Sequence, residues 1–246
     1  MPEEIFAVVA REWRERIPAI GGGRLVGIVI SALLVAGLGV LLPLRVGQRW
    51  MSLSVVGIVA TCTVSVLSMD YVLATISGER ILRRRGDSRF RGTSDESIVF
   101  GEIVAGSLYA FLMILVVLLA GLITVNLGFP AAEVRLYPAG DLVAILLASL
   151  LLAELFGGLA SVVLLGVGKE GLARVLMISV ILAVFILPPF LYAVGPEFLR
   201  ASMSDLIFRL GRVRLLVTGM TFLLALDVAV LLWLRERVRN GGLGSP

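Results

Sequence analysis

The stretch "IVAGSLYAFLMILVVLLAGLITVNL", residues 103–127, contains 25 residues and no charged side chain. About 20 helical residues are enough to cross the roughly 30 Å hydrocarbon core of a bilayer. Apolar residues fill this stretch without alternating with polar ones, so it lacks the pattern of a strand in a membrane barrel. Because backbone groups in lipid must be hydrogen-bonded within their own segment, the stretch predicts a transmembrane helix.

Five more apolar runs of similar length flank this one. Of the 246 residues, 59% are hydrophobic and 16% are charged, whereas about a quarter of the residues of soluble proteins are charged. The sequence therefore predicts an all-α integral membrane protein with six transmembrane helices. The predicted spans are Leu25–Leu44, Met51–Ile76, Ile103–Leu127, Leu142–Val167, Val175–Val194 and Leu215–Leu234.

Two amphipathic helices are expected outside the spans. Residues 1–23 form a cytoplasmic N-terminal segment ahead of a six-span domain at residues 24–246, and its apolar residues recur every four positions at Ile5, Val9, Trp13 and Ile17. A short helix between spans five and six carries a similar stripe at Leu199, Met203, Leu206 and Leu210. Both patterns are typical of helices that lie in a membrane interface.

The distribution of arginine and lysine predicts the orientation. With a cytoplasmic N-terminus, fifteen basic residues lie inside and seven lie outside. By the positive-inside rule, both termini are then cytoplasmic, and we expect a multi-pass protein of the plasma or inner membrane.

Several classes of enzyme are excluded by what the sequence lacks. Histidine is absent and Cys62 is the single cysteine, which excludes histidine-based acid–base catalysis, histidine zinc sites and an internal disulfide. The stretch "GVGKEG", residues 166–171, has Val163 and Glu170 where a phosphate-binding loop needs glycine and serine or threonine. We therefore expect no catalytic residues, no metal site and no cofactor bound by this chain.

The predicted connection between spans two and three is unusually basic. The stretch "ISGERILRRRGDSRFRGTSDESIVFGE", residues 76–102, contains six arginines. It resembles the first cytoplasmic loop of ABC-2 type transporter permeases, in which an acidic "GE(R/K)" leads to an "EI-x-x-GK" that opens the third span. The matching residues are Gly78, Glu79, Arg80, Ser94, Ile98, Val99 and Gly101. The chain departs from the pattern at Arg83–Arg85, at Gly92 in place of a proline and at Glu102 in place of a lysine.

The resemblance implies a function for residues 78–101 as a coupling loop. A separate P-loop ATPase subunit, which binds ATP and magnesium, would contact this loop. By the same resemblance, the permease would be an exporter and would work as a homodimer or with a close homologue. The implied coupling residues are Glu79, Arg80, Arg83, Arg84, Arg85, Ser94 and Gly101. For Arg83–Arg85, binding of anionic lipid is an equal alternative. Thr93 and Glu96 have the spacing of a capping box that would start the next helix.

Three acidic residues fall within predicted spans, at Asp70, Glu154 and Asp227. A carboxylate in a membrane costs roughly 2.5–3.5 kcal/mol on insertion scales, so each is a candidate for the translocation pathway. A structural hydrogen bond is the alternative for Glu154, and ion pairing near the cytoplasmic end is the alternative for Asp70. Gly157 and Gly158 predict close helix packing.

Two other functional classes stay open beside the permease. The buried acids would also serve an ion-coupled secondary transporter, although such carriers are built from repeats and the halves of this chain show none. A membrane-embedded enzyme acting on lipid is disfavoured by the missing catalytic motifs. The transported substrate is not identified by any of these residues.

Overall fold

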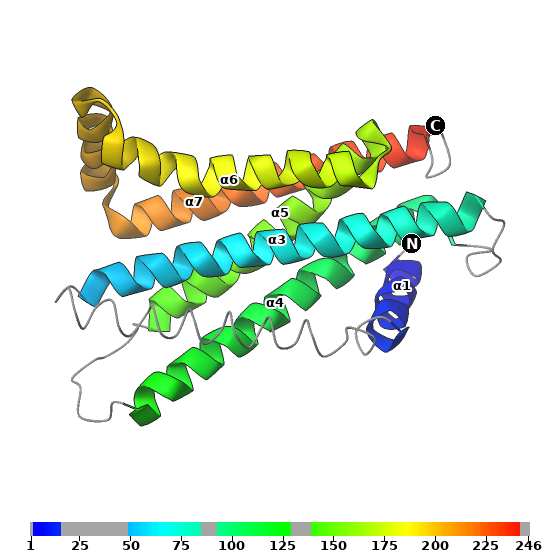
Figure 1. Ribbon diagram of the computed structural model, residues 1–246, viewed down its shortest axis with the longest axis horizontal. Helices are drawn as coiled ribbons and strands as arrows, with labels where there is room; N and C mark the ends of the chain where they lie inside the picture. Colours follow the sequence, from blue (N-terminus) through cyan, green and yellow to red (C-terminus); the bar gives the residue numbers. More distant parts are fainter. Residues whose placement is uncertain (1, 16–48, 85–92, 129–138, 242–246) are drawn as a thin grey trace.

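The computed structural model describes residues 2–15, 49–84, 93–128 and 139–241, and Figure 1 shows these segments as helices. The predicted all-α fold is confirmed for them, because none of the described residues lies in a strand. The first predicted span, Leu25–Leu44, falls outside the described residues. The helices are α1 (Pro2–Glu15), α3 (Arg49–Arg84), α4 (Asp95–Gly128), α5 (Ala139–Val167), α6 (Glu170–Val194) and α7 (Glu197–Gly241).

Four segments of the described chain are long and apolar enough to cross a membrane: Ala60–Arg80, Asp95–Val116, Val143–Val167 and Arg214–Asn240. They overlap the second, third, fourth and sixth predicted spans. The fifth predicted span forms helix α6 but is not among these four, so the number of six spans stays a prediction. Four such helices are the hallmark of a multi-pass membrane protein.

Helix α3 lies at the centre of the arrangement, where it packs against α4, α5 and α6. Helix α7 packs mainly on α5, and the short helix α1 packs on α4 near the end of α3 (Figure 1). Apolar side chains on the outer faces of α6 and α7 are exposed, including Leu187, Val217 and Phe222. Such faces suit a lipid environment, in which apolar surface needs no protein cover.

The connection between α3 and α4 is shorter than the predicted coupling loop. Helix α3 continues to Arg84 and α4 begins at Asp95, so residues 78–84 and 95–101 are helical rather than loop. The predicted capping box is also wrong by one position. Ser94, the residue after Thr93, caps α4, because the backbone N–H of Ser97 donates to the Ser94 hydroxyl at 3.2 Å.

The helix predicted between spans five and six is the first part of α7. The chain turns at Gly211, whose φ of 67° and ψ of 161° are readily adopted only by glycine. Before this turn, the side chains of Leu199, Met203, Leu206 and Leu210 fall outside the described ones. The amphipathic and interfacial character of this helix therefore stays a prediction.

The predicted close packing at Gly157 and Gly158 is confirmed. A Cβ atom at Gly158 would lie 3.1 Å from Val230 Cγ1 of α7, and one at Gly157 would lie 3.0 Å from Ser68 Oγ of α3. Ser68 also donates a hydrogen bond to the carbonyl of Ala153 at 2.6 Å. These two glycines let α5 approach both neighbours closely, which fixes the position of α5 in the bundle.

Candidate functional site

Arg11, Glu12, Tyr71, Glu79 and Glu102 come together where α1 meets α3 and α4, and we call this group the α1 junction. Nη2 of Arg11 lies 3.0 Å from Oε1 of Glu12, 3.4 Å from Oε1 of Glu102 and 3.6 Å from Oε1 of Glu79. The Tyr71 hydroxyl donates to Oε2 of Glu12 at 3.0 Å. One arginine thus joins carboxylates from three helices.

The three carboxylates of the α1 junction are almost completely buried. Their side chains are 0–1% exposed, and one oxygen of each lies within 4.8 Å of the others. In the described part of the chain, these are the residues that could hold a divalent cation by their spacing. The guanidinium of Arg11 already supplies a positive charge in contact with all three, which stabilises the carboxylates as a cation would.

The face of α1 that packs on the bundle differs from the predicted apolar stripe. Val8 and Glu12 are the buried positions, whereas Ile5 and Val9 are only partly buried. Glu4, Val8 and Glu12 are spaced four residues apart, so they lie on one side of the helix. The contact face is therefore polar at both ends and apolar in the middle, displaced by one residue from the predicted stripe.

Glu4 attaches the beginning of α1 to the beginning of α4. Its Oε2 accepts hydrogen bonds from the hydroxyls of Ser97 at 2.7 Å and Ser94 at 3.1 Å. These hydrogen bonds, that of Ser97 first, lower the pKa of Glu4 below its ordinary value of 4.5. A carboxylate at this place also complements the partial positive charge at the N-terminus of α4.

We predict that acid weakens this attachment. Because the pKa of Glu4 is lower in the folded state than in the unfolded chain, the contact stabilises docking above about pH 4.5, and the stabilisation is lost as the pH falls through the folded pKa. Trp13 on α1 reports docking by its fluorescence in a background with Trp50 and Trp233 replaced by phenylalanine. The signal should change with acidification in the parent, and this acid component should vanish in Glu4→Gln. An identical acid transition in both proteins would contradict the assignment.

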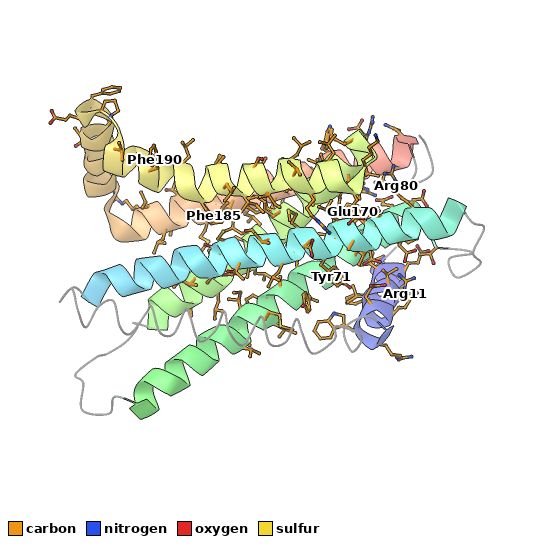
Figure 2. All side chains as sticks on the ribbon, viewed as in Figure 1. Arg11, Tyr71, Arg80, Glu170, Phe185 and Phe190 are labelled. Atoms are coloured by element: carbon orange, nitrogen blue, oxygen red, sulfur yellow. The ribbon has the colours of Figure 1, made fainter. Side chains whose placement is uncertain are left out.

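Three further arginines join helices at the same end of the bundle. Nη1 of Arg80 donates to the carbonyl of Leu164 at 3.4 Å, joining α3 to α5. The other two form ion pairs, Arg174 with Asp70 at 2.9 Å and Arg235 with Glu96 at 2.6 Å. Figure 2 shows Arg11 and Arg80 at this end, with Phe190 at the opposite end. The arginines that the sequence assigns to the cytoplasmic side thus hold the helix ends together.

The residues predicted to couple to an ATPase fall into three groups. Glu79 is 1% exposed in the α1 junction, and Gly101 is buried against Val8 of α1. Arg80 and Ser94 bind neighbouring helices within this chain, as described above. The side chains of Arg83 and Arg84, and the whole of Arg85, fall outside the described residues. Glu79 and Gly101 therefore position the hairpin of α3 and α4, and they are too buried to contact a soluble partner directly.

The three acids predicted for the pathway do not form one site. Asp70 is 40% exposed and paired with Arg174, which agrees with the ion-pair alternative. Asp227 is 3% exposed on α7, and Glu154 is partly buried on α5. The two are close enough for their charges to interact. Asp70 is thus a structural residue by its contacts, whereas Glu154 and Asp227 lie on the two packed helices α5 and α7.

Sequence reasoning missed Arg11, Glu12, Tyr71 and Glu102 as site residues. A helical pattern places Arg11 and Glu12 among the charged residues of the amphipathic helix, which are normally solvated. The available signal was the four-residue spacing of Glu4, Val8 and Glu12, which marks a second face. Only the folded chain brings residues 12, 79 and 102 together.

Comparison of the chain with protein-family models, with curated proteins and with solved structures finds no match.

Proposed function

We propose that this chain is the transmembrane permease subunit of an ATP-binding cassette transporter, working as an exporter. Its partners in this proposal are a separate P-loop ATPase subunit, which carries ATP and magnesium, and a second permease subunit, identical or closely related. Six spans, an interfacial N-terminal helix, cytoplasmic termini and a plasma or inner membrane location complete the proposal. The chain itself would catalyse no reaction.

The hairpin of α3 and α4 carries this proposal. Its connecting residues 85–94 include Arg85, Arg89 and Arg91, and planar guanidinium groups are well suited to directional contacts with a soluble subunit. Both arms of the hairpin are held by α1, through Glu79 on α3 and Gly101 on α4. A partner that moves the connection would therefore move α1 and both helices together, which is what a coupling element requires.

A second candidate function rests on a different observation, the pair of Glu154 and Asp227. Two acidic residues on packed helices of a membrane bundle are also suited to an ion-coupled secondary transporter. The two functions differ in their energy source. Transport in vesicles that depends on ATP and the ATPase chain supports the permease, whereas transport driven by an ion gradient without ATP supports the carrier.

The test of the permease proposal exchanges Arg83, Arg84 and Arg85 together. The triple glutamine variant removes charge and bidentate donors, and the triple lysine variant keeps the charge but removes the planar fork. We expect both variants to insert normally, since basic residues remain elsewhere on the cytoplasmic side. Co-purification of the ATPase chain and substrate-stimulated ATP hydrolysis should both fall in the glutamine variant and fall less in the lysine variant.

Neutral-lipid nanodiscs separate coupling from lipid binding. If these arginines only bind anionic lipid, both variants will match the parent in nanodiscs made of neutral lipid. Coupling contacts predict a loss there as well, and the loss should increase with salt because exposed charges are screened. ATP hydrolysis by the purified chain alone would contradict the whole proposal.

A further inference from the structure

Asp227 is buried on helix α7, although the residues next to it in the chain are exposed. In the most apolar 18-residue window of the candidate span Arg214–Asn240, only 6% of the residues are buried, and the neighbouring side chains of Leu226 and Val228 are 38% and 47% exposed. Asp227 is 3% exposed instead, and its Oδ1 has no hydrogen-bond partner among the described residues. An apolar helix thus turns its one mid-span carboxyl group into the bundle, where a polar group is costly unless something binds to it.

The acidic residue at the level of Asp227 on the neighbouring helix α5 is Glu154. In the chain, α6 lies between α5 and α7, and it runs antiparallel to both, so α5 and the main part of α7 run in the same direction (Figure 1). Gly158 of α5 contacts Val230 and Leu231 of α7. One helical turn earlier on each helix, the same register brings Glu154 to the level of Asp227. Their charges are indeed close enough to interact.

Several charged groups on the helices around this pair are bound elsewhere. On α3 and α6, Asp70 pairs with Arg174, which also contacts Glu170. Arg80 binds the carbonyl of Leu164, and Arg235 of α7 pairs with Glu96 of α4 two turns beyond Asp227. Other titratable groups are held in or beside the α1 junction: Arg11, Glu12, Tyr71, Glu79, Glu102 and Tyr109. Cys62 packs against the apolar core.

The sequence agrees with this isolation. Glu154 is the only charged residue between positions 143 and 167, and Asp227 is the only one between positions 215 and 234. Two carboxyl groups in apolar surroundings cannot both ionise without a counter-charge, so such pairs hold a proton in common. We propose that Glu154 and Asp227 form a proton-binding dyad, which holds one exchangeable proton between its two carboxyl groups across the α5–α7 contact.

A proton fits this site better than a metal ion. Hard cations such as calcium take 6–8 oxygen ligands, and magnesium needs an octahedral set. The dyad offers two carboxyl groups, while its neighbours Gly158, Val230 and Leu231 offer no side-chain oxygen and the helical carbonyls are already hydrogen-bonded.

Binding of the proton leaves one negative charge in the dyad, and its release leaves two like charges that repel α5 from α7. Protonation is thereby linked to the packing of these two helices.

Infrared spectroscopy of the purified full chain in nanodiscs tests the dyad without an ATPase subunit. At neutral pH, the parent should show the C=O stretching band of a protonated carboxylic acid, and alkaline titration should abolish it. The variant carrying both Glu154→Gln and Asp227→Asn should lack the titrating band. Glu170→Gln is the matched control, because it removes a carboxyl group in an ion pair outside the dyad, and it should keep the band at full intensity.

The outcomes separate this inference from the proposed function. Absence of the band in the parent at neutral pH, or its full persistence in the double variant, would overturn the dyad and leave the permease proposal untouched. Loss of the parent band when sodium replaces choline at constant pH would overturn it in favour of an alkali cation site. The single variants Glu154→Gln and Asp227→Asn keep the test valid if the double variant does not fold, since each should alter the band while Glu170→Gln does not.

Discussion

Replacing Arg11 by glutamine should lower the free energy of unfolding of the described helices by about 3–5 kcal/mol, the range found when one partner of a buried ion pair is removed. Nη2 of Arg11 contacts Glu12, Glu79 and Glu102, which are at most 1% exposed. Without the guanidinium, three buried carboxylates on three helices repel each other. The expected result is release of α1 together with loosening of the α3–α4 hairpin.

The matched control is Arg14→Gln on the same helix. Arg14 is exposed, so its replacement should change stability by no more than about 0.5 kcal/mol. Chemical denaturation in detergent measures the stability, and the fluorescence of Trp13 reports the position of α1. Equal stabilities of the Arg11→Gln and Arg14→Gln variants would refute the role given to the α1 junction.

A second substitution tests whether charge is the cause of the loss. Adding Glu102→Gln to Arg11→Gln removes one of the repelling carboxylates but keeps the shape of the side chain. Part of the lost stability should return, so the two substitutions should be non-additive. In the presence of Arg11, Glu102→Gln alone should instead be destabilising, because it removes a partner of the guanidinium.

The sequence predicted the parts of this fold that follow from local chemistry. Apolar runs predicted the helices that could span a membrane, and the adjacent Gly157 and Gly158 predicted close helix packing. Each of these signals can be recognised within a short stretch of sequence. The distribution of arginine in the sequence also predicted that Arg11, Arg80, Arg174 and Arg235 lie at the same end of the bundle. The ion pair of Asp70 was also foreseen, although its partner is Arg174 on α6 rather than an arginine of the connection after α3.

The α1 junction could not be predicted in the same way. A charged residue on an amphipathic helix is normally solvated, and although the spacing of Glu4, Val8 and Glu12 marks a second face, it does not indicate that Glu12 is buried beside residues 79 and 102. For Glu79, the family resemblance suggested a surface position, but α3 continues through it to Arg84. A continued helix turns Glu79 toward α1 and α4. Such assignments depend on where helices end and where they cross, and these are the structural features that a sequence defines least closely.

A smaller substitution tests the contact between α1 and α4 directly. A Cβ atom at Gly101 would lie 2.6 Å from both Cβ and Cγ1 of Val8, closer than van der Waals contact allows. Because Val8 Cβ is fixed to the backbone of α1, the helix must move away. Overpacking typically costs about 1–3 kcal/mol, which exceeds the gain of about 0.5–1 kcal/mol from replacing a helical glycine by alanine. Gly101→Ala should therefore weaken the docking of α1.

Gly78→Ala is the matched control for this substitution, because Gly78 is also helical and a Cβ atom there meets nothing within 4 Å. It should leave Trp13 fluorescence unchanged and slightly raise stability. Combining Gly101→Ala with Val8→Gly moves the missing Cβ atom from α4 to α1, so the helices can approach as in the parent. This exchange should restore the position of Trp13, although Val8→Gly weakens α1 itself. Normal docking in Gly101→Ala alone would show that α1 does not rest on α4 at this position.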